Sequence, residues 1–161
     1  KGKNFNLSNC GMHAMDIMRM ESGFLHWGHD ISPEENQFQA GLSFTISSKK
    51  EVDFIGKKAL EKIKKTKIKS RFAMFTLKDS EPGNPLLLHD EPVYIDNKII
   101  GRSTSGNYSF NFKKNLVFGY INNNLSNEEL KSKSLFIEIE KKKYPISIQL
   151  QALKQTNYKR Q

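Results

Sequence analysis

Residues 135–150, LFIEIEKKKYPISIQL, alternate apolar and polar side chains on both sides of a run of three lysines. Successive side chains of a β-strand point to opposite faces, so this alternation predicts two strands that each bury one face. The lysines at 141–143 predict the turn of a hairpin between them. The inward face is expected to consist of Ile137, Ile139, Ile146, Ile148 and Leu150.

The same period of two extends upstream as far as Arg71. Asp96-Asn97 separates two short apolar runs and is a two-residue hairpin signal. Residues 101–106, GRSTSG, lack the lysine of a phosphate-binding loop and are expected to form a turn or a bulge. Several short strands separated by turns predict a barrel or sandwich over residues 71–150. The additional strands are expected at 72–77, 93–95, 98–101 and 116–121.

Residues 1–70 mix helical and extended patterns. Ser8 is expected to cap a short helix, and a strand is expected at 19–24. Ser32-Pro33-Glu34-Glu35 predicts a helix start, and the alternation at 42–47 predicts a strand. Asp53 is expected to cap a further helix, which ends in a basic tether before Arg71. The predicted apolar face of that helix is Ile55, Ala59, Leu60 and Ile63.

The composition limits the possible classes of protein. The 161 residues are 37% hydrophobic, which is enough for one domain or two small ones, and the mean hydropathy of -0.62 argues against a membrane-spanning helix. A single cysteine predicts a reducing compartment, and we expect a cytoplasmic protein. The chain does not begin with Met, so it is expected to be processed or part of a longer polypeptide.

The net charge of +9 is concentrated in lysine runs at 57–58, 62–69 and 141–143. Such runs form either solvated faces or a surface that binds an anion, and aromatic residues do not interleave with them as they would on a nucleic-acid platform. Nucleic acid is therefore not the expected partner.

Two groups of residues could carry chemistry by themselves. His26 and His29 could bind zinc, but no further ligands occur at a recognisable spacing, so no metal site is predicted. Cys10 and His13 could act as nucleophile and base, but no acid to orient the histidine is identifiable. The residues alone give no complete catalytic group.

Three motifs occur in order: ESGFLHWGHDISPEENQFQAGL at 21–42, VDFIGKKAL at 52–60 and IIGRSTSGNYSFNFKKNLVFGYI at 99–121. Together they resemble the C-terminal half of the folate-binding aminomethyltransferase family, the family of the glycine-cleavage T-protein. The closest resemblance within it is to the C-terminal region of dimethylglycine and sarcosine dehydrogenases. The resemblance implies an α+β fold, with the end of the folate-binding region at residues 1–70 and an antiparallel β-barrel at 71–161.

The resemblance also implies a function. Members transfer a one-carbon unit from an aminomethyl or imine group to tetrahydrofolate, and in the dehydrogenases a separate upstream domain with FAD generates that group from an N-methylated glycine. The expected partners are folate, a methylated amine-derived substrate and the upstream part of the same polypeptide, with no membrane partner. The alternatives are a folate-dependent demethylase of a sulfonium compound and a non-catalytic folate- or nucleic-acid-binding relative.

The resemblance assigns folate contacts to three residues of this chain. Phe24 and Trp27 match aromatic positions of the folate cleft, and Arg71 matches an arginine at the start of the barrel. The chain departs from the family at Met15, where members usually have an arginine that helps to hold folate. The catalytic carboxylate of the family lies upstream of the matched region, so no catalytic residue is expected within residues 1–161.

Overall fold

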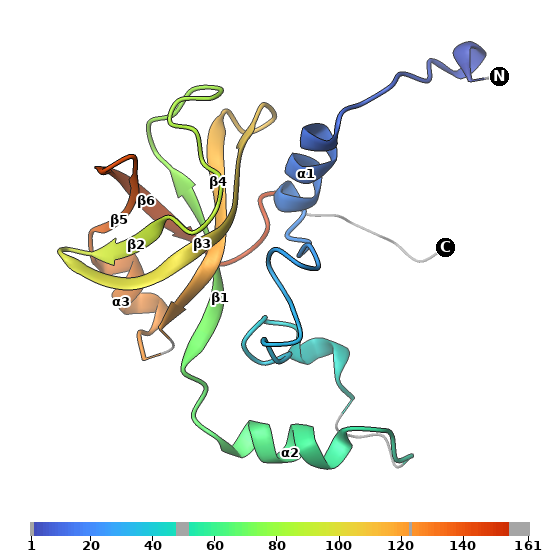
Figure 1. The fold of residues 1–161 in the computed structure, drawn as a ribbon, viewed down its shortest axis with the longest axis vertical. Coiled ribbons are helices and arrows are strands. Elements are labelled where there is room, and N and C mark those ends of the chain that lie inside the picture. Colours follow the sequence, from blue (N-terminus) through green and yellow to red (C-terminus); the bar gives the residue numbers. More distant parts are fainter. Residues whose placement is uncertain (1, 48–51, 123, 155–161) are drawn as a thin grey trace.

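A computed structural model of the chain describes residues 2–47, 52–122 and 124–154. Its main feature is a closed antiparallel barrel of six strands in the order β1-β4-β3-β2-β5-β6 (Figure 1). Together with the helices this gives the predicted α+β fold, and the barrel is confirmed. The strands are β1 Ser70–Leu77, β2 Pro92–Ile95, β3 Lys98–Ser109, β4 Lys114–Asn122, β5 Leu135–Ile139 and β6 Lys142–Gln149.

Tight turns set the register of the two short hairpins. Asp96 has a φ of 53° at the turn between β2 and β3, as the Asp-Asn signal predicts. The turn between β5 and β6 differs from the prediction, because it consists of Glu140 and Lys141, both with positive φ. Lys142 and Lys143 therefore belong to β6.

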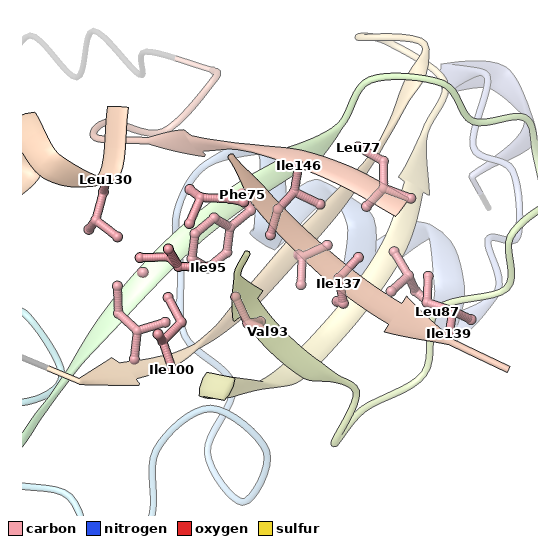
Figure 2. Packing of buried hydrophobic residues seen from close by; sticks show 14 residues of the cluster. Phe75, Leu77, Leu87, Val93, Ile95, Ile100, Leu130, Ile137, Ile139 and Ile146 are labelled. Atoms are coloured by element: carbon pink, nitrogen blue, oxygen red, sulfur yellow. The ribbon is translucent and has the colours of Figure 1, made fainter. Parts of the chain in front are cut away.

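The barrel interior is filled by the inward side chains of all six strands, with Leu87 from a loop and Leu130 from the helix α3, Asn127–Ser132 (Figure 2). Phe75, Val93 and Ile137 are each at most 1% exposed. Leu150 was predicted to point inward, but it follows the end of β6 and is 44% exposed. Alternation along the strands supplies this core, because each strand turns one face inward.

The helix α1, Met12–Glu21, packs against the outer face of the barrel. Met20 meets Leu116 and Phe118 of β4 there, which explains why β4 is apolar on both faces. The prediction of a strand at 19–24 was wrong, because α1 continues to Glu21 and ends where Gly23 adopts a φ of 75°. Gly11, not Ser8, precedes the first helical residue.

Three further predictions for residues 32–56 were wrong. Residues 32–41 form turns, and 42–47 contain only the short 3-10 helix η2, Ser43–Thr45, since no strand pairs with this segment. The helix α2, Lys57–Lys65, begins after Gly56 and not after Asp53. It buries none of its residues fully and stands apart from the barrel (Figure 1). A second 3-10 helix, η1, spans Lys3–Phe5.

Candidate functional site

A cleft of about 630 Å³ lies where residues 22–44 cross the first half of β1 and the end of β6. Phe24 and Arg71, which are 47 positions apart in the numbering, both line it. Apolar and aromatic side chains form most of the remaining wall. These are Leu25, Ile31, Ala40, Leu42, Phe44, Phe72, Met74, Ile148 and Leu150.

Phe24 is presented to the cleft by the end of α1. The left-handed Gly23 reverses the chain, and the backbone N–H of Phe24 donates to the carbonyl of Arg19 at 2.8 Å. Phe24 is 55% exposed. An exposed aromatic face on a fixed backbone is suited to stacking on a planar ligand.

Arg71 lies at the start of β1 and reaches toward α3. Its Nη1 donates to Oδ1 of Asn127 at 2.8 Å, and its Nη2 donates to the carbonyl of Leu125 at 3.0 Å. Within the described residues, Nε of Arg71 is buried and has no hydrogen-bond partner. Arg71 therefore has a structural role, because it joins the start of β1 to the segment that leads into α3.

Trp27 lies outside the lining of this cleft and is 65% exposed. It occupies a turn in which Asp30 N donates to the carbonyl of His26 at 2.9 Å. The rings of His26 and His29 lie side by side in the same turn, 4.6 Å apart. Across the described part of the chain, no group of three or more His, Cys, Asp or Glu residues could hold a metal ion.

A buried polar network between α1, the 24–30 turn and β3 was not predicted from the sequence. Arg19 of α1 contacts the carboxylates of Asp16 and Asp30 and donates to Ser105 Oγ at 2.9 Å. The side chain of Asp30 is fully buried, and Thr104 and Ser105 of β3 both donate to it. The only sequence signals for this network were Asp30 in the first motif, Arg19 just before that motif, and the serine-rich stretch at 101–106.

Glu21 is a second buried carboxylate, and each of its oxygens accepts a hydrogen bond. Ser109 Oγ donates to its Oε1 at 2.5 Å, and Asn111 Nδ2 donates to its Oε2 at 2.9 Å. Because Glu21 and Asp30 are each about 1% exposed and accept hydrogen bonds on both oxygens, neither is accessible for proton transfer to a ligand.

A larger groove of about 880 Å³ lies on the other side of the 28–35 turn. It is polar and carries both signs of charge, from Glu34, Glu35, Asp90 and Arg102. Hydrogen bonds from His89 and Arg102 hold the pKa of Asp90 below its ordinary value. Burial raises the pKa of the Tyr120 hydroxyl, which donates to the Asp30 carbonyl at 2.9 Å.

Comparison with known proteins identifies the family. The sequence model of the GCVT N-terminal domain matches residues 1–50, and that of the glycine cleavage T-protein C-terminal barrel domain matches residues 71–153. The chain belongs to the glycine cleavage T-protein family. The predicted resemblance is thereby confirmed, while the division of the chain at residue 70 stays a prediction.

Two relatives of the chain are named as an oxidase and a dehydrogenase. The chain is 43% identical over 107 residues to 4-methylaminobutanoate oxidase (formaldehyde-forming) of Paenarthrobacter nicotinovorans, covering 66% of this chain and 13% of the relative. It is 34% identical over 150 residues to the mitochondrial dimethylglycine dehydrogenase of Homo sapiens, covering 91% of this chain and 16% of the relative. The chain thus spans less than a fifth of these relatives.

A solved structure supports the T-protein fold. The aminomethyltransferase T of the Bartonella henselae glycine cleavage system superposes with a TM-score of 0.68 at 23% identity, over 84% of this chain and 36% of that chain. Within the described residues, no helix has the length and apolar content needed to cross a bilayer.

Proposed function

We propose that residues 1–161 form the C-terminal part of a tetrahydrofolate-dependent enzyme of the aminomethyltransferase type. The enzyme transfers a one-carbon unit from an N-methylglycine-derived imine or aminomethyl group to tetrahydrofolate. We place the chain in a dimethylglycine or sarcosine dehydrogenase-like polypeptide, whose upstream part carries FAD. The observation that carries the proposal is the cleft that Phe24 and Arg71 share.

The cleft residues fit a folate in chemical terms. A folate has a planar pterin, a benzoyl ring and a glutamate tail, and the exposed ring of Phe24 supplies a stacking surface for a planar group. Arg71 lines the same cleft, and its guanidinium is a charged donor, which favours a carboxylate. Aromatic and aliphatic side chains around them exclude water from the rest of the ligand.

The residues of this chain bind and orient, and the proton-transfer group is assigned to the upstream part. Glu21 and Asp30 are the buried carboxylates of residues 2–47, and both oxygens of each already accept hydrogen bonds from the protein. Transfer requires a carboxylate within hydrogen-bond reach of the reacting nitrogen, with the pterin held still against it. We therefore expect residues 1–161 alone to be inactive.

Free, exposed Cys10 is consistent with the cytoplasmic location that we propose.

The test measures methylenetetrahydrofolate formation from a formaldehyde-derived imine and tetrahydrofolate. Residues 1–161 are compared with a polypeptide extended upstream, and a reaction without protein gives the uncatalysed background. We expect turnover only with the extended polypeptide, and a loss of turnover in its Phe24→Ala variant. Turnover by residues 1–161 alone at the rate of the extended polypeptide would contradict the assignment of the acid.

A second candidate function is favoured by one relative and one residue. The relative that is 43% identical is named as formaldehyde-forming, and Met15 stands where the resemblance leads us to expect a folate-binding arginine. In that case the full polypeptide oxidises a methylated amine and releases formaldehyde. Free formaldehyde in the presence of excess tetrahydrofolate, with no methylenetetrahydrofolate above background, would favour this alternative.

A further inference from the structure

Asp30 is a buried carboxylate that the proposed chemistry does not use. We propose that Asp30, together with Thr104 and Ser105 of β3, positions the aromatic loop, defined here as residues 24–30, so that Phe24 forms a fixed wall of the cleft. Asp30, Thr104 and Ser105 are thus positioning residues that touch no ligand. The inference rests in part on the proposed function, because Phe24 must contact folate for its position to matter.

A β-bulge allows two consecutive residues to reach the same carboxylate. Ser103 pairs with Gly119 and Ser105 pairs with Phe118, so Thr104 has no opposite residue in β4. Consecutive side chains of a regular strand point to opposite faces, but a bulge redirects them. Thr104 Oγ1 and Ser105 Oγ consequently donate to the same Oδ1 of Asp30, at 2.6 and 2.8 Å.

The other oxygen of Asp30 fixes the beginning of the aromatic loop. Its Oδ2 accepts from the backbone N–H of His26 at 2.9 Å and from the guanidinium of Arg19. Nη1 of Arg19 also donates to the carbonyl of Phe24 at 3.2 Å. The backbone of the loop is therefore held at residues 24 and 26 through Arg19 and Asp30, which both bond to Ser105 at the bulge in β3. Tyr120 of β4 additionally donates to the carbonyl of Asp30.

The second buried carboxylate provides a matched comparison. Glu21 receives a hydrogen bond from Ser109 of β3, just as Asp30 receives one from Ser105. Both contacts join the segment before the barrel to β3, but the Glu21 contact involves no residue of the aromatic loop. Attachment of α1 to the barrel and positioning of the loop are thus separable by substitution.

Trp27 makes the loop directly observable, because it is the only tryptophan in the chain. The first experiment measures the time-resolved fluorescence anisotropy of residues 1–161. In the double variant Thr104→Val, Ser105→Ala, we expect the amplitude of nanosecond Trp27 motion to rise about two-fold. Ser109→Ala should leave it unchanged, and Thr104→Ser, which retains the hydroxyl, should preserve the wild-type value. If the double variant does not fold, Thr104→Val alone is measured.

The second experiment measures tetrahydrofolate affinity of the full-length polypeptide by equilibrium binding. A small misplacement of a group in an active site can lower the reaction rate by up to about a hundred-fold. For binding, we expect the double variant to hold tetrahydrofolate about ten-fold more weakly. Ser109→Ala, which removes a bond in the same interface, is expected to change the affinity less than about two-fold. Thr104→Ser is expected to restore most of the loss.

The outcomes separate this inference from the proposed function. Unchanged Trp27 motion in the variants would overturn the inference. Increased motion with unchanged affinity, in a polypeptide that binds folate, would overturn the connection between the loop and the ligand. A wild-type polypeptide without folate affinity would overturn the proposed function instead, and increased Trp27 motion would then still support the positioning role of Asp30.

Discussion

The barrel and the segment before it bury different kinds of side chain. In the barrel, the buried residues are mainly aliphatic and aromatic, and the strands pair around a closed ring. In the described part of residues 2–69, only Met20, Glu21, Asp30 and Ala40 are buried, and two of these four are carboxylates. The barrel is therefore stabilised mainly by apolar burial, whereas the preceding segment is held in place by one small apolar cluster around Met20 and by a few charged hydrogen bonds.

The two regions should therefore respond differently to loss of apolar volume and to loss of a charged partner. Loss of apolar volume should affect the barrel strongly and the preceding segment weakly. Loss of one charged partner should affect the position of the segment more than the integrity of the barrel. The following predictions test this contrast, from the largest expected effect to the smallest.

The largest effect is expected from Phe75→Ala in β1. Phe75 is 1% exposed in the barrel interior, and removal of a buried phenylalanine ring typically costs about 3–5 kcal/mol through lost burial and a residual cavity. Phe44→Ala is the matched control, because Phe44 is 81% exposed, and it should cost less than about 0.5 kcal/mol. Urea unfolding of both variants measures the free energy of unfolding. Equal losses of stability in the two variants would contradict the proposed difference between the barrel and the preceding segment.

Arg19→Met should displace the segment before the barrel. It leaves the Asp30 carboxylate buried without its cation, a change that costs about 3 kcal/mol. We expect faster amide hydrogen exchange in α1 and the aromatic loop and little change in the barrel strands. The control is Arg102→Met, because the Arg102–Asp90 pair is more than half exposed and should contribute under about 1 kcal/mol. Uniformly faster exchange across the barrel would contradict the contrast.

Arg71→Ala tests a residue at the junction of the two regions. We expect tetrahydrofolate to bind the full-length polypeptide more weakly by about 1–3 kcal/mol, the usual loss for a charged hydrogen bond. Arg71→Lys keeps the charge but not the forked geometry and should give an intermediate loss. Isothermal titration at low salt measures the affinities. Unchanged affinity in Arg71→Ala would show that Arg71 does not bind folate and has only a structural role through Asn127 and Leu125.

The smallest effect is expected at the capping box of α3, which covers one end of the barrel. Ser126→Ala removes the cap and should cost about 1 kcal/mol. The hydrogen bonds from Ser126 lower the pKa of Glu129, so their contribution is present above its ordinary value of 4.5 and is lost as the pH falls through the lowered value. Ser126→Ala keeps the backbone N–H that is the largest cause of this shift, so thermal unfolding should show both proteins losing stability in acid, with most of the difference between them retained. Ser132→Ala, outside the cap, is the control.

Much of the barrel was predictable from the sequence because its strands carry a period of two that no helix shares. The turn between β2 and β3 and the two-sided apolar strand at 72–77 followed from local residues, whereas the turn between β5 and β6 lies one residue earlier than predicted. The segment before the barrel was harder to predict, because the pattern at Arg19, Met20 and Glu21 fits a strand as well as a helix. Packing of Met20 on Phe118 and the Asp16–Arg19 pair decide for the helix, and neither is visible in the alternation.

The candidate site was predictable only in part. Phe24 and Arg71 were both selected from the resemblance, and the fold brings them into one cleft. The network that holds the aromatic loop joins Asp30 to Ser105 across 75 positions and Arg19 to Ser105 across 86. Local patterns carry no information about contacts at such separations, although the stretch at 101–106 was correctly expected to contain a bulge or a turn.

The closure of the barrel has a consequence for biosynthesis. β1 pairs with β4 and with β6, so the ring is complete only when Leu77 meets Ile146 and Met74 meets Gln149. A ribosome must therefore have delivered β6 before the edge of β1 is covered. Until then the nascent chain exposes an unpaired apolar strand edge, and pairing across such long sequence separations slows folding. The interval between emergence of β1 and β6 is accordingly the period in which a chaperone is most needed.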